Sequence, residues 1–316
     1  MGGDRAPDEI VAGARQASDQ GFAVVLVGRR DDLGDTGDVP VVDASEVIGM
    51  TEDPASAVRT KKDSSLVRAA ELVRDAKACA MVSAGNTGAG MAAALLRYGR
   101  LPGVARPAIA APIPVPGAGF TVLVDAGANA ECQPEWLVQF AQLGSAFSSV
   151  RFGVDSPRVG LLSIGEEATK GSALVKAAHA LLLDAAGIDF IGNVEGRDLL
   201  TDDVDVVVTD GFTGNVALKT LEGGIKFIVN AVFAAMTAND AAKASGNVLL
   251  PELMPVAEAL DPDSHGGAAL LGLKGLCLIG HGSSSARAVV NAVRTAHELA
   301  AADLVGHLAA SVAPAR

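Results

Sequence analysis

Short, near-continuous hydrophobic runs alternate along the chain with longer segments of helical periodicity. The runs are typical of β-strands covered on both faces, because each face of such a strand must be apolar. They begin near residues 22, 79, 120, 158, 188, 205 and 275. The segments between them predict helices at about 64–77, 88–98, 134–148, 171–186, 213–237 and 283–311. The alternation predicts an α/β fold: a doubly wound, mostly parallel sheet with helices on both faces.

The composition supports a folded protein with a large core. The chain has 316 residues, of which 49% are hydrophobic, and its 36 glycines suit the tight turns of an α/β protein. No tandem repeat or low-complexity linker divides it, so we expect residues 1–316 to form a single domain. The sequence shows no signal peptide and no long uncharged apolar run, which predicts a cytoplasmic protein.

Charge and aromatic content argue against nucleic-acid binding. The net charge is −12, so the chain as a whole does not attract a phosphate backbone. Aromatic residues make up 3% of the chain, which disfavours a surface on which bases stack. We therefore expect no nucleic acid among the partners.

The familiar catalytic and metal-binding motifs do not occur in the sequence. Neither G-x-S-x-G nor H-E-x-x-H is present, and the five histidines lack ligand spacing. We interpret the three widely spaced cysteines as buried thiols of a reducing compartment: Cys79, Cys132 and Cys277. Glu166 and Glu167 beside Lys170 are compatible with an acid–base or metal cluster, and equally with an acidic helix start. Nothing here requires a metal or a cofactor.

Small polar residues and glycines follow almost every predicted strand. In an open parallel sheet, ligands bind at the carboxyl ends of the strands, where these residues lie. Glycine lets backbone N–H groups approach a ligand closely, and the following helix adds its positive end, so such turns suit a phosphate-like anion. Tight turns without a ligand are the alternative. The loops are "SAGNTGAG" (83–90), "DAGAN" (125–129), "IGEEATKG" (164–171), "GNVEGRD" (192–198), "TDGFTGN" (209–215) and "HGSSS" (281–285).

Nucleotide-binding motifs fit these loops poorly. The loop "SAGNTGAG" follows a strand and opens a helix, but its spacing is G-x-x-G-x-G rather than G-x-G-x-x-G. A G-x-x-x-x-G-K-[ST] loop does not occur either. The sequence therefore disfavours a nicotinamide-dependent enzyme and a nucleoside triphosphatase.

Eight segments resemble, in chain order, the motifs of the bacterial phosphate acyltransferases of phospholipid synthesis. The resemblance extends from residue 1 to about residue 300, and the "SAGNTGA" and "TDGFTGN" blocks are its most specific parts. The segments are "MGGDRAP", "VRTKKDSS", "SAGNTGA", "DAGAN", "VGLLSIGEEATKG", "FIGNVEGRD", "VVVTDGFTGNVALKTLEG" and "HGGAALLGLKG...HGSSSARAVVNAVRTA".

The resemblance implies a reaction and partners. Long-chain acyl-acyl carrier protein and orthophosphate would give acyl phosphate and free carrier protein, without a cofactor. It also implies a homodimer whose fold is like that of isocitrate and isopropylmalate dehydrogenases and the phosphate acetyltransferases. A helical projection near residues 225–262 would support peripheral membrane attachment, and the downstream glycerol-phosphate acyltransferase would be a further partner there.

The sequence departs from the family pattern at two places. Family members usually carry a strand similar to "RIAVDA" before the "MGGD" block, whereas this chain starts at Met1 of the block, so we expect the first family strand to be missing. A family "YGGAPLLG" reads "HGGAALLG" here, which places His265 at the aromatic position. We expect this change to affect packing more than chemistry.

The absence of a catalytic nucleophile fits that chemistry. Orthophosphate is already an anionic nucleophile, and a thiolate leaves readily, so the protein has to supply a desolvated pocket and a donor for the oxyanion. With the resemblance in hand, Lys170 is our candidate for neutralising the phosphate or the oxyanion. Asn215 is our candidate oxyanion donor, assisted by the amides of Gly211 and Gly214. A solvent-exposed lysine and a helix-capping asparagine are the structural alternatives.

The other candidate phosphate- and substrate-binding residues come from the same loops. For Arg197, an ion pair with Glu195 or Asp198 is an equal alternative. The set consists of Ser83, Gly85, Asn86, Thr87, Gly88, Asp125, Asn129, Gly165, Glu166, Asn193, Glu195, Arg197, Asp210, Gly211, Thr213, Gly214, His281 and Ser283.

Downstream of residue 220 the sequence becomes strongly apolar. Seven residues form one helical stripe, for which core or dimer packing is the default interpretation: Leu221, Ile225, Ile228, Val229, Val232, Phe233 and Met236. The following "GNVLLPELMPVAEAL" is apolar and interrupted by proline, and an apolar tip there would insert into a membrane without a basic face. A basic cluster is a candidate docking surface for an acidic carrier protein, or simply a solvated helix start: Arg59, Lys61, Lys62 and Arg68.

Two other functions remain open from the sequence. A phosphate acetyl- or butyryltransferase that uses acyl-coenzyme A has the same physical requirements. A non-catalytic membrane-associated scaffold of lipid synthesis belongs to a different class and would release no thiol from any donor.

Overall fold

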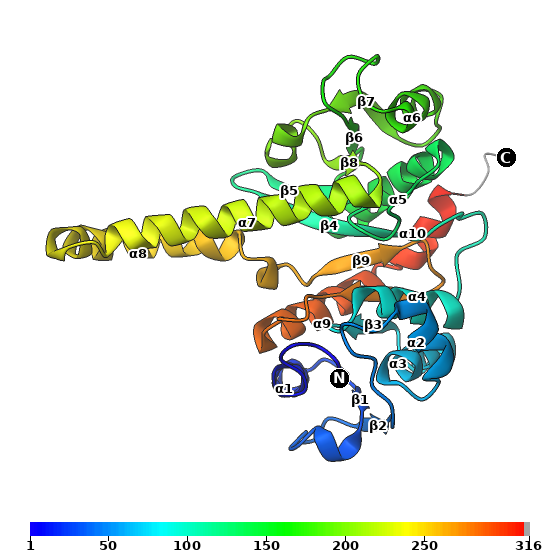
Figure 1. Cartoon of the computed structure of the whole chain (residues 1–316), viewed down its shortest axis with the longest axis vertical. Helices are drawn as coiled ribbons and strands as arrows, with labels where there is room; N and C mark the ends of the chain where they lie inside the picture. Colours follow the sequence, from blue (N-terminus) through cyan, green and yellow to red (C-terminus); the bar gives the residue numbers. More distant parts are fainter. Residues whose placement is uncertain (313–316) are drawn as a thin grey trace.

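The computed structural model describes residues 1–312 (Figure 1). Eight of its strands form a central sheet, in the order β3-β10-β9-β4-β5-β8-β6-β7. A separate pair of short parallel strands lies near the N-terminus: β1 (Leu26–Gly28) and β2 (Val41–Asp43). The strands of the central sheet are β3 (Ala80–Ser83), β4 (Ala108–Val115), β5 (Gly119–Val124), β6 (Arg158–Leu162), β7 (Asp189–Val194), β8 (Val206–Val208), β9 (Ala268–Leu271) and β10 (Leu276–Ile279).

Helices cover both faces of this sheet, as the sequence predicts. One face packs against α5, α6, α9 and α10 in a large apolar cluster around Phe140. The other face packs against α2, α3 and α4, with α1 lying against α9. The helices of the body are α1 (Asp8–Asp19), α2 (Pro54–Thr60), α3 (Ser65–Arg74), α4 (Thr87–Arg97), α5 (Pro134–Phe152), α6 (Ala173–Leu183), α9 (Ala286–Ala301) and α10 (Leu304–Ser311). Three short 3₁₀ turns are η1 (Arg30–Asp32), η2 (Gly196–Leu200) and η3 (Pro262–Ser264).

The strands form two parallel blocks that run in opposite directions. Strands β3 and β10 are parallel to each other, and β5, β8, β6 and β7 are parallel to one another. Between the blocks, β9 and β4 pair antiparallel with their neighbours, so three of the seven pairings are antiparallel and four are parallel. The predicted mostly parallel sheet is therefore confirmed, with a reversal in its centre.

The register places the carboxyl ends of both blocks at one level. Ile279 at the end of β10 pairs with Ala268, and the next residue, Ala269, pairs with Ala110, which in turn pairs with Val124 at the end of β5. The two strand ends thus differ by one residue along the strand direction. Three strand spacings, about 14 Å, separate them across the sheet. The loops that follow both blocks consequently meet over the middle of the sheet.

Strand β4 contains two prolines although it has a strand on each side. Its pairing with β9 stops at Ala110, so the backbone beyond that residue has a partner only on the β5 side. Pro112 and Pro114 lie in this half-paired part, where a missing N–H removes no ladder bond to β9. The sequence pattern did not predict this strand. Its prolines lie where β4 and β9 are no longer paired.

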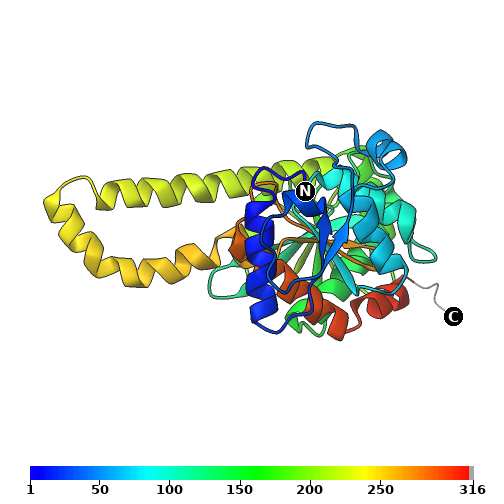
Figure 2. The ribbon, with the colours of Figure 1, turned by 90° about the horizontal axis from the view of Figure 1, so that it is seen from below.

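Two long helices project from the body as a hairpin: α7 (Gly211–Met236) and α8 (Asp240–Ala259) (Figures 1 and 2). The predicted helical projection is confirmed. Within the described chain the apolar stripe of α7 is not a core stripe, since Ile228 is 62% and Val232 42% exposed. Of the two packing alternatives, core packing is therefore wrong for the stripe beyond Leu221, which packs against a core cluster, and dimer packing stays a prediction. Helix α8 also continues through Pro251 and Pro255, where the sequence indicated an interruption.

Several elements were not predicted or were predicted differently. The sequence patterns missed α1, α2, α8, β2, β4 and β9. The helix predicted at 283–311 is two helices, because Asp303 adopts a left-handed backbone conformation between α9 and α10. Cys79 is exposed rather than buried, whereas Cys277 is buried as expected.

Helix α7 begins in very close contact with the end of β5, and glycine makes that contact possible. A Cβ atom on Gly214 would lie 1.9 Å from the carbonyl oxygen of Asp125, whereas one on Gly223 would meet nothing within 4 Å. We expect Gly214→Ala to lower the free energy of unfolding by about 1–3 kcal/mol, because the helix must shift. The matched Gly223→Ala should raise it by about 0.5–1 kcal/mol, since alanine restricts the unfolded chain.

Urea unfolding followed by circular dichroism measures both changes. Equal effects of the two substitutions would show that the close approach of α7 to β5 does not constrain the fold.

Candidate functional site

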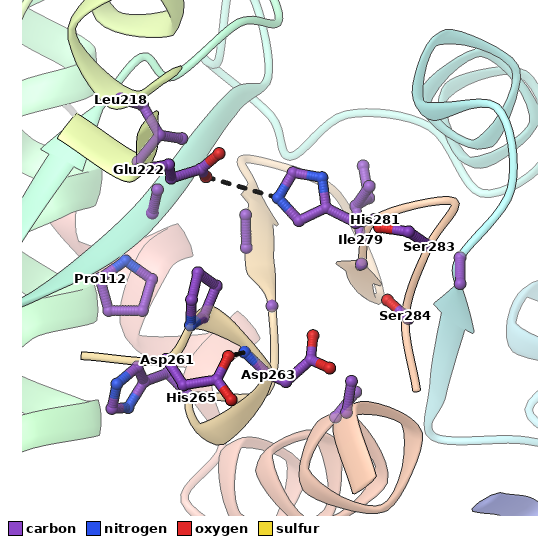
Figure 3. Close-up of a pocket in the computed structure, with 18 of the residues that line it drawn as sticks. Pro112, Leu218, Glu222, Asp261, Asp263, His265, Ile279, His281, Ser283 and Ser284 are labelled. Carbon is purple, nitrogen blue, oxygen red and sulfur yellow. Dashed lines mark hydrogen bonds and ion pairs between the residues drawn. The ribbon is translucent and has the colours of Figure 1, made fainter. Parts of the chain in front are cut away.

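A cavity of about 980 Å³ lies over the middle of the sheet, where the two strand blocks meet. Residues from β3, β4, β9 and β10 contribute to one side of it, and α7, the end of α8 and the start of α9 to the others. Figure 3 shows side chains from several of these elements pointing into it. The cavity is where an open α/β sheet with converging strand ends is expected to bind a ligand.

Five of the predicted residues line the polar part of the cavity: Ser83, Thr87, Asn215, His281 and Ser283. Ser83 ends β3 and Thr87 begins the following helix, Asn215 lies in the helix that follows β8, and the other two follow β10. The structure therefore brings together loops from both blocks, and residues separated by about 200 positions in the sequence meet at one site.

Asn215 has the features expected of a residue that binds a ligand. It lies in the first turn of α7, and its side chain is exposed to the cavity. No hydrogen bond of this side chain is found within residues 1–312. The cap of α7 is instead Asp210, which accepts hydrogen bonds from the backbone N–H (2.9 Å) and hydroxyl (2.7 Å) of Thr213. Helix capping therefore does not account for Asn215.

One turn beyond Asn215, two charged residues of α7 meet His281. Lys219 Nζ lies 2.7 Å from Glu222 Oε2 and 3.1 Å from His281 Nε2. Figure 3 shows the ring of His281 directed toward Glu222, whose Oε1 is 3.4 Å from Nε2. Burial by itself raises the pKa of Glu222, but hydrogen bonds from His281 and Lys219 outweigh it and hold the pKa below its ordinary value. Glu222 is therefore ionised, and the cluster joins the two halves of the cavity.

Asp125 is a structural residue rather than a ligand. Its carboxylate is completely buried and accepts five hydrogen bonds, from the backbone of Ile109, Gly127, Ala128 and Asn129 and from the Asn129 side chain, at 2.8–3.1 Å. Burial raises the pKa of this carboxyl, and the five N–H donors oppose that rise. With all its lone pairs engaged, Asp125 fixes the 125–129 loop to β4. The direct ligand role predicted for it is not supported by this geometry.

The predicted asparagines mostly hold loops in place. The Asn86 side chain caps α4 by accepting from Ala89 N (3.0 Å) and donates to three carbonyls of residues 49–52. Asn129 donates to the carbonyl of Pro107 at 2.8 Å as well as to Asp125. Asn193 donates to the carbonyl of Glu167 at 2.9 Å and contacts His179 Nδ1. Their side-chain groups are thus engaged within the protein.

The glycine amides at the start of α7 are engaged too. The N–H of Gly211 donates to the carbonyl of Asn129 (2.8 Å), and that of Gly214 donates to the carbonyl of Asp210 (2.9 Å). We expected both amides to assist Asn215, and this expectation is corrected: neither N–H group is available to a ligand. Both glycines are needed because a Cβ atom on either would collide with the 125–129 loop.

The loops after β6 and β7 lie outside the cavity lining. Arg197 forms ion pairs with Glu195 (3.0 Å), Glu166 (3.2 Å) and Asp198 (3.7 Å), which links the two loops. Lys170 is exposed, and no ion pair of its side chain occurs within residues 1–312. The structure does not bring Lys170 to the cavity that Asn215 lines. Gly85, Gly88 and Gly165 do not line it either.

Other polar residues of the cavity were missed by sequence reasoning. Lys219 and Glu222 are at the fourth and seventh positions after Asn215, a spacing that puts all three on one face of a helix, so helical periodicity offered a signal. The others are Arg5, Lys226, Glu258, Asp261, Asp263, His265, Ser284 and Arg287, none of which was predicted to bind a ligand. Arg287 is paired with Glu258 (3.0 Å) and Asp261. His265 packs edge-on against Phe120, as expected of a residue at an aromatic position.

Half of the predicted basic cluster is neutralised by ion pairs. Lys61 bonds to Glu52 at 2.6 Å, and Arg68 pairs with Glu71 (3.1 Å) and with a second carboxylate. For Arg59 and Lys62 no ion pair occurs among residues 1–312. The cluster is thus less basic than its sequence suggests.

The thiols that the structure describes as buried or half-buried are poor nucleophiles. Burial raises the pKa of Cys132 to about 11 and that of Cys277 to about 12, so both keep their protons near neutral pH. Among residues 1–312 no group of three His, Cys, Asp or Glu side chains is arranged to hold a metal ion. In the same part of the chain, no helix combines the length and the apolarity that crossing a bilayer requires.

Comparison with known proteins identifies relatives over nearly the whole chain. A family model described as "Fatty acid synthesis protein" matches residues 1–306. The chain is 46% identical to a phosphate acyltransferase of Desulforudis audaxviator over 321 residues, covering 100% of this chain and 95% of the relative. It is 47% identical to a phosphate acyltransferase of a Nostoc species over 309 residues, covering 94% and 90% of the two chains.

Solved structures share the fold at much lower identity. The phosphotransacetylase EutD from Staphylococcus aureus aligns with a TM-score of 0.60 at 17% identity, covering 93% of this chain and 91% of its own. A phosphotransacetylase from Streptococcus pyogenes aligns with a TM-score of 0.61 at 16% identity, covering 94% and 92%. This likeness confirms the fold predicted from the resemblance.

The hydrogen bonds of Asp125 predict a large effect of a small change. In Asp125→Asn the new NH₂ group would face N–H donors, so at least one buried donor loses its acceptor, and we expect a loss of about 2–4 kcal/mol in the free energy of unfolding. Asp210→Asn is the matched control, because asparagine caps a helix about as well as aspartate. Chemical unfolding of both variants measures the difference. Equal stability of the two would rule out the bonding role assigned to Asp125.

Proposed function

The chain belongs to the phosphate acyltransferase family, and we propose that it transfers a fatty acyl group from a carrier thioester to orthophosphate, as a step of phospholipid synthesis. The observation that supports this most strongly is identity of 45–49% to phosphate acyltransferases over nearly the full chain. The site is consistent with it, because polar strand-end residues and an apolar wall share one cavity.

The chemistry needs no covalent bond to the protein. An oxygen of orthophosphate attacks the thioester carbonyl carbon, an oxyanion forms, and the carbon–sulfur bond breaks as the oxyanion collapses. The products are the acyl phosphate and a thiolate; the proton that hydrogenphosphate loses in becoming the acyl phosphate balances the one that the thiolate gains, with water as the carrier. The protein contributes by holding the two reactants together away from bulk water and by donating hydrogen bonds to the oxyanion.

We assign the oxyanion donor to Asn215. Its amide is exposed in the cavity and unbonded within the described residues, so donation to a substrate breaks no existing bond. Ser83, Thr87, His281 and Ser283 surround it and are proposed to bind the phosphate or the thioester. The Lys219–Glu222 pair adds an ammonium group beside His281.

A role for Lys170 in binding phosphate requires its loop to move. Its loop follows β6, which is the neighbour of β8 in the sheet, and α7 with Asn215 follows β8. Lys170 is exposed and forms no ion pair within residues 1–312, so movement of the loop would break none of its ion pairs. We propose that the loop closes over bound phosphate and brings the Lys170 ammonium to its charge.

We propose acyl carrier protein as the thioester donor and a homodimer as the working form. The exposed apolar residues of α7, such as Phe227 and Ile228, suit contact with a second copy of the chain. In the first half of α8, Val248 is 75% and Leu249 54% exposed, which suits shallow insertion into a membrane from the cytoplasmic side. An acyl phosphate is a reactive anhydride, so an acyltransferase that consumes it would benefit from being nearby.

Release of free thiol from long-chain acyl-acyl carrier protein tests the function. We expect release that depends on phosphate and is accompanied by acyl phosphate. Acyl-coenzyme A serves as the alternative donor, and faster turnover of acetyl- or butyryl-coenzyme A would favour a short-chain enzyme. No phosphate-dependent release from any donor would contradict the proposed function.

Variants of the two candidate residues extend the same assay. Asn215→Ala should lower kcat by about 100- to 1000-fold, because one oxyanion donor is lost, while the melting temperature stays nearly unchanged. We expect Lys170→Ala to lower turnover sharply as well, whereas Lys176→Ala on the exposed side of α6 should not. Near-normal turnover in Asn215→Ala or Lys170→Ala removes the role assigned to that residue.

The exposed apolar residues in the first half of α8 make a separate prediction. A variant with Val248→Asp, Leu249→Asp and Leu250→Asp should lose flotation with liposomes, because charged side chains cannot enter the apolar layer. Light scattering of the same variant should still give the mass of two chains, because these changes in α8 leave the α7 stripe intact. Flotation equal to that of the unmodified protein would refute the membrane contact.

A further inference from the structure

We propose that the acyl chain of the substrate lies between α7 and α8, and that Val229, Met254 and Ala257 set the chain length that the enzyme accepts. This inference rests on the proposed function, since it places the apolar part of that substrate. It goes further by assigning a chain-length filter to the base of the projecting hairpin.

The wall that α7 contributes changes from polar to apolar along one helical face. Asn215 is followed on this face by Leu218, Leu221, Ile225 and Val229, all of which line the cavity. Lys226 also lines it, but this residue is exposed, so its ammonium group stays in solvent while its aliphatic stem adds to the apolar surface. At 1.5 Å per residue, the wall from Asn215 to Val229 is about 21 Å long. A thioester carbonyl at Asn215 would therefore direct its chain along this wall, toward the hairpin.

The opposite wall comes from α8. The two helices touch near the tip, where a Cβ atom on Gly246 would lie 3.1 Å from the Cβ of Met236, and they diverge toward the body (Figure 2). Met254 and Ala257 of α8 line the cavity in this diverging part. Because α8 runs antiparallel to α7, Met254 lies at the Val229 end and Ala257 nearer the sheet.

The sheet supplies the third side. Ile113, with Pro112 and Pro114 of β4, lines the cavity where β4 is no longer paired with β9. This segment offers apolar side chains and, at the prolines, no backbone N–H that a lipid chain would leave unbonded. The charged groups at the end of α8 do not oppose an apolar occupant, because Glu258 and Asp261 are paired with Arg287.

These walls favour a long chain over a short acyl group. Each methylene that moves from water onto an apolar wall strengthens binding about fourfold, so the effect multiplies along the chain until the wall ends. An acetyl or butyryl group at Asn215 would leave Ile225, Val229 and Met254 uncovered. Chain-length preference should therefore depend on residues that are far from the reacting carbonyl.

The substitution Ala257→Trp tests the inference by filling the space between the helices. The assay is phosphate-dependent thiol release from carrier thioesters in a series from butyryl to palmitoyl. We expect kcat/KM for palmitoyl to fall roughly tenfold or more, with butyryl changed less than about twofold and KM for phosphate unchanged. Ala244→Trp is the matched control, because Ala244 is exposed on the same helix and does not line the cavity; its profile should equal that of the unmodified protein.

A second variant tests the inference in the opposite direction. Met254→Ala lengthens the space and should shift the optimum toward longer chains, and it remains informative if Ala257→Trp lowers the melting temperature. Unchanged profiles in both variants, or an equal loss for all chain lengths in each, would overturn the inference. Those results differ from failure of the proposed function, in which the unmodified protein releases no thiol from any member of the series.

Discussion

The site depends on one constraint: the carboxyl ends of two oppositely directed strand blocks lie at the same level of one sheet. The antiparallel strands β9 and β4 fix this level through their register, which places Ile279 and Val124 one residue apart along the strands. Loops that follow β3, β8 and β10 therefore face one another across a cavity. A shift in this register would separate His281 from Asn215 and remove the site.

A second, local constraint gives the cavity its long wall. Asp125 accepts four hydrogen bonds from the loop after β5 and one from Ile109 of β4, and Gly211 and Gly214 let α7 begin directly against that loop. The direction of α7 is thus set at its first turn. The rest of the helix then extends past the sheet and presents one face to the cavity and another to solvent. The loop residues that are most recognisable in sequence act largely through this scaffold.

Residue types alone did not distinguish ligands from scaffold. Asn86, Asn129, Asn193 and Asn215 all follow strands beside glycines, and one of the four, Asn215, has a side chain exposed in the cavity. The other three bond to carbonyl groups of neighbouring loops, which are distant in sequence. The sequence pattern did not predict strand β4, because it contains two prolines. A strand accommodates proline only where its backbone N–H is not needed for pairing, and here that depends on where the pairing with β9 ends. Helical periodicity from Asn215 could have predicted Lys219 and Glu222 as cavity residues, whereas no sequence pattern pointed to Arg287 or Asp261.

The sequence by itself determined the α/β class, the strand ends that carry polar loops, the family and its chemistry, because these follow from local hydrophobic periodicity and from contiguous motifs. The tertiary structure decided which loops meet, which amides and carboxylates are already bonded, and that the apolar stripe of α7 projects from the body. Each of these depends on pairings between residues far apart along the chain. Such pairings leave no periodic trace in a single sequence.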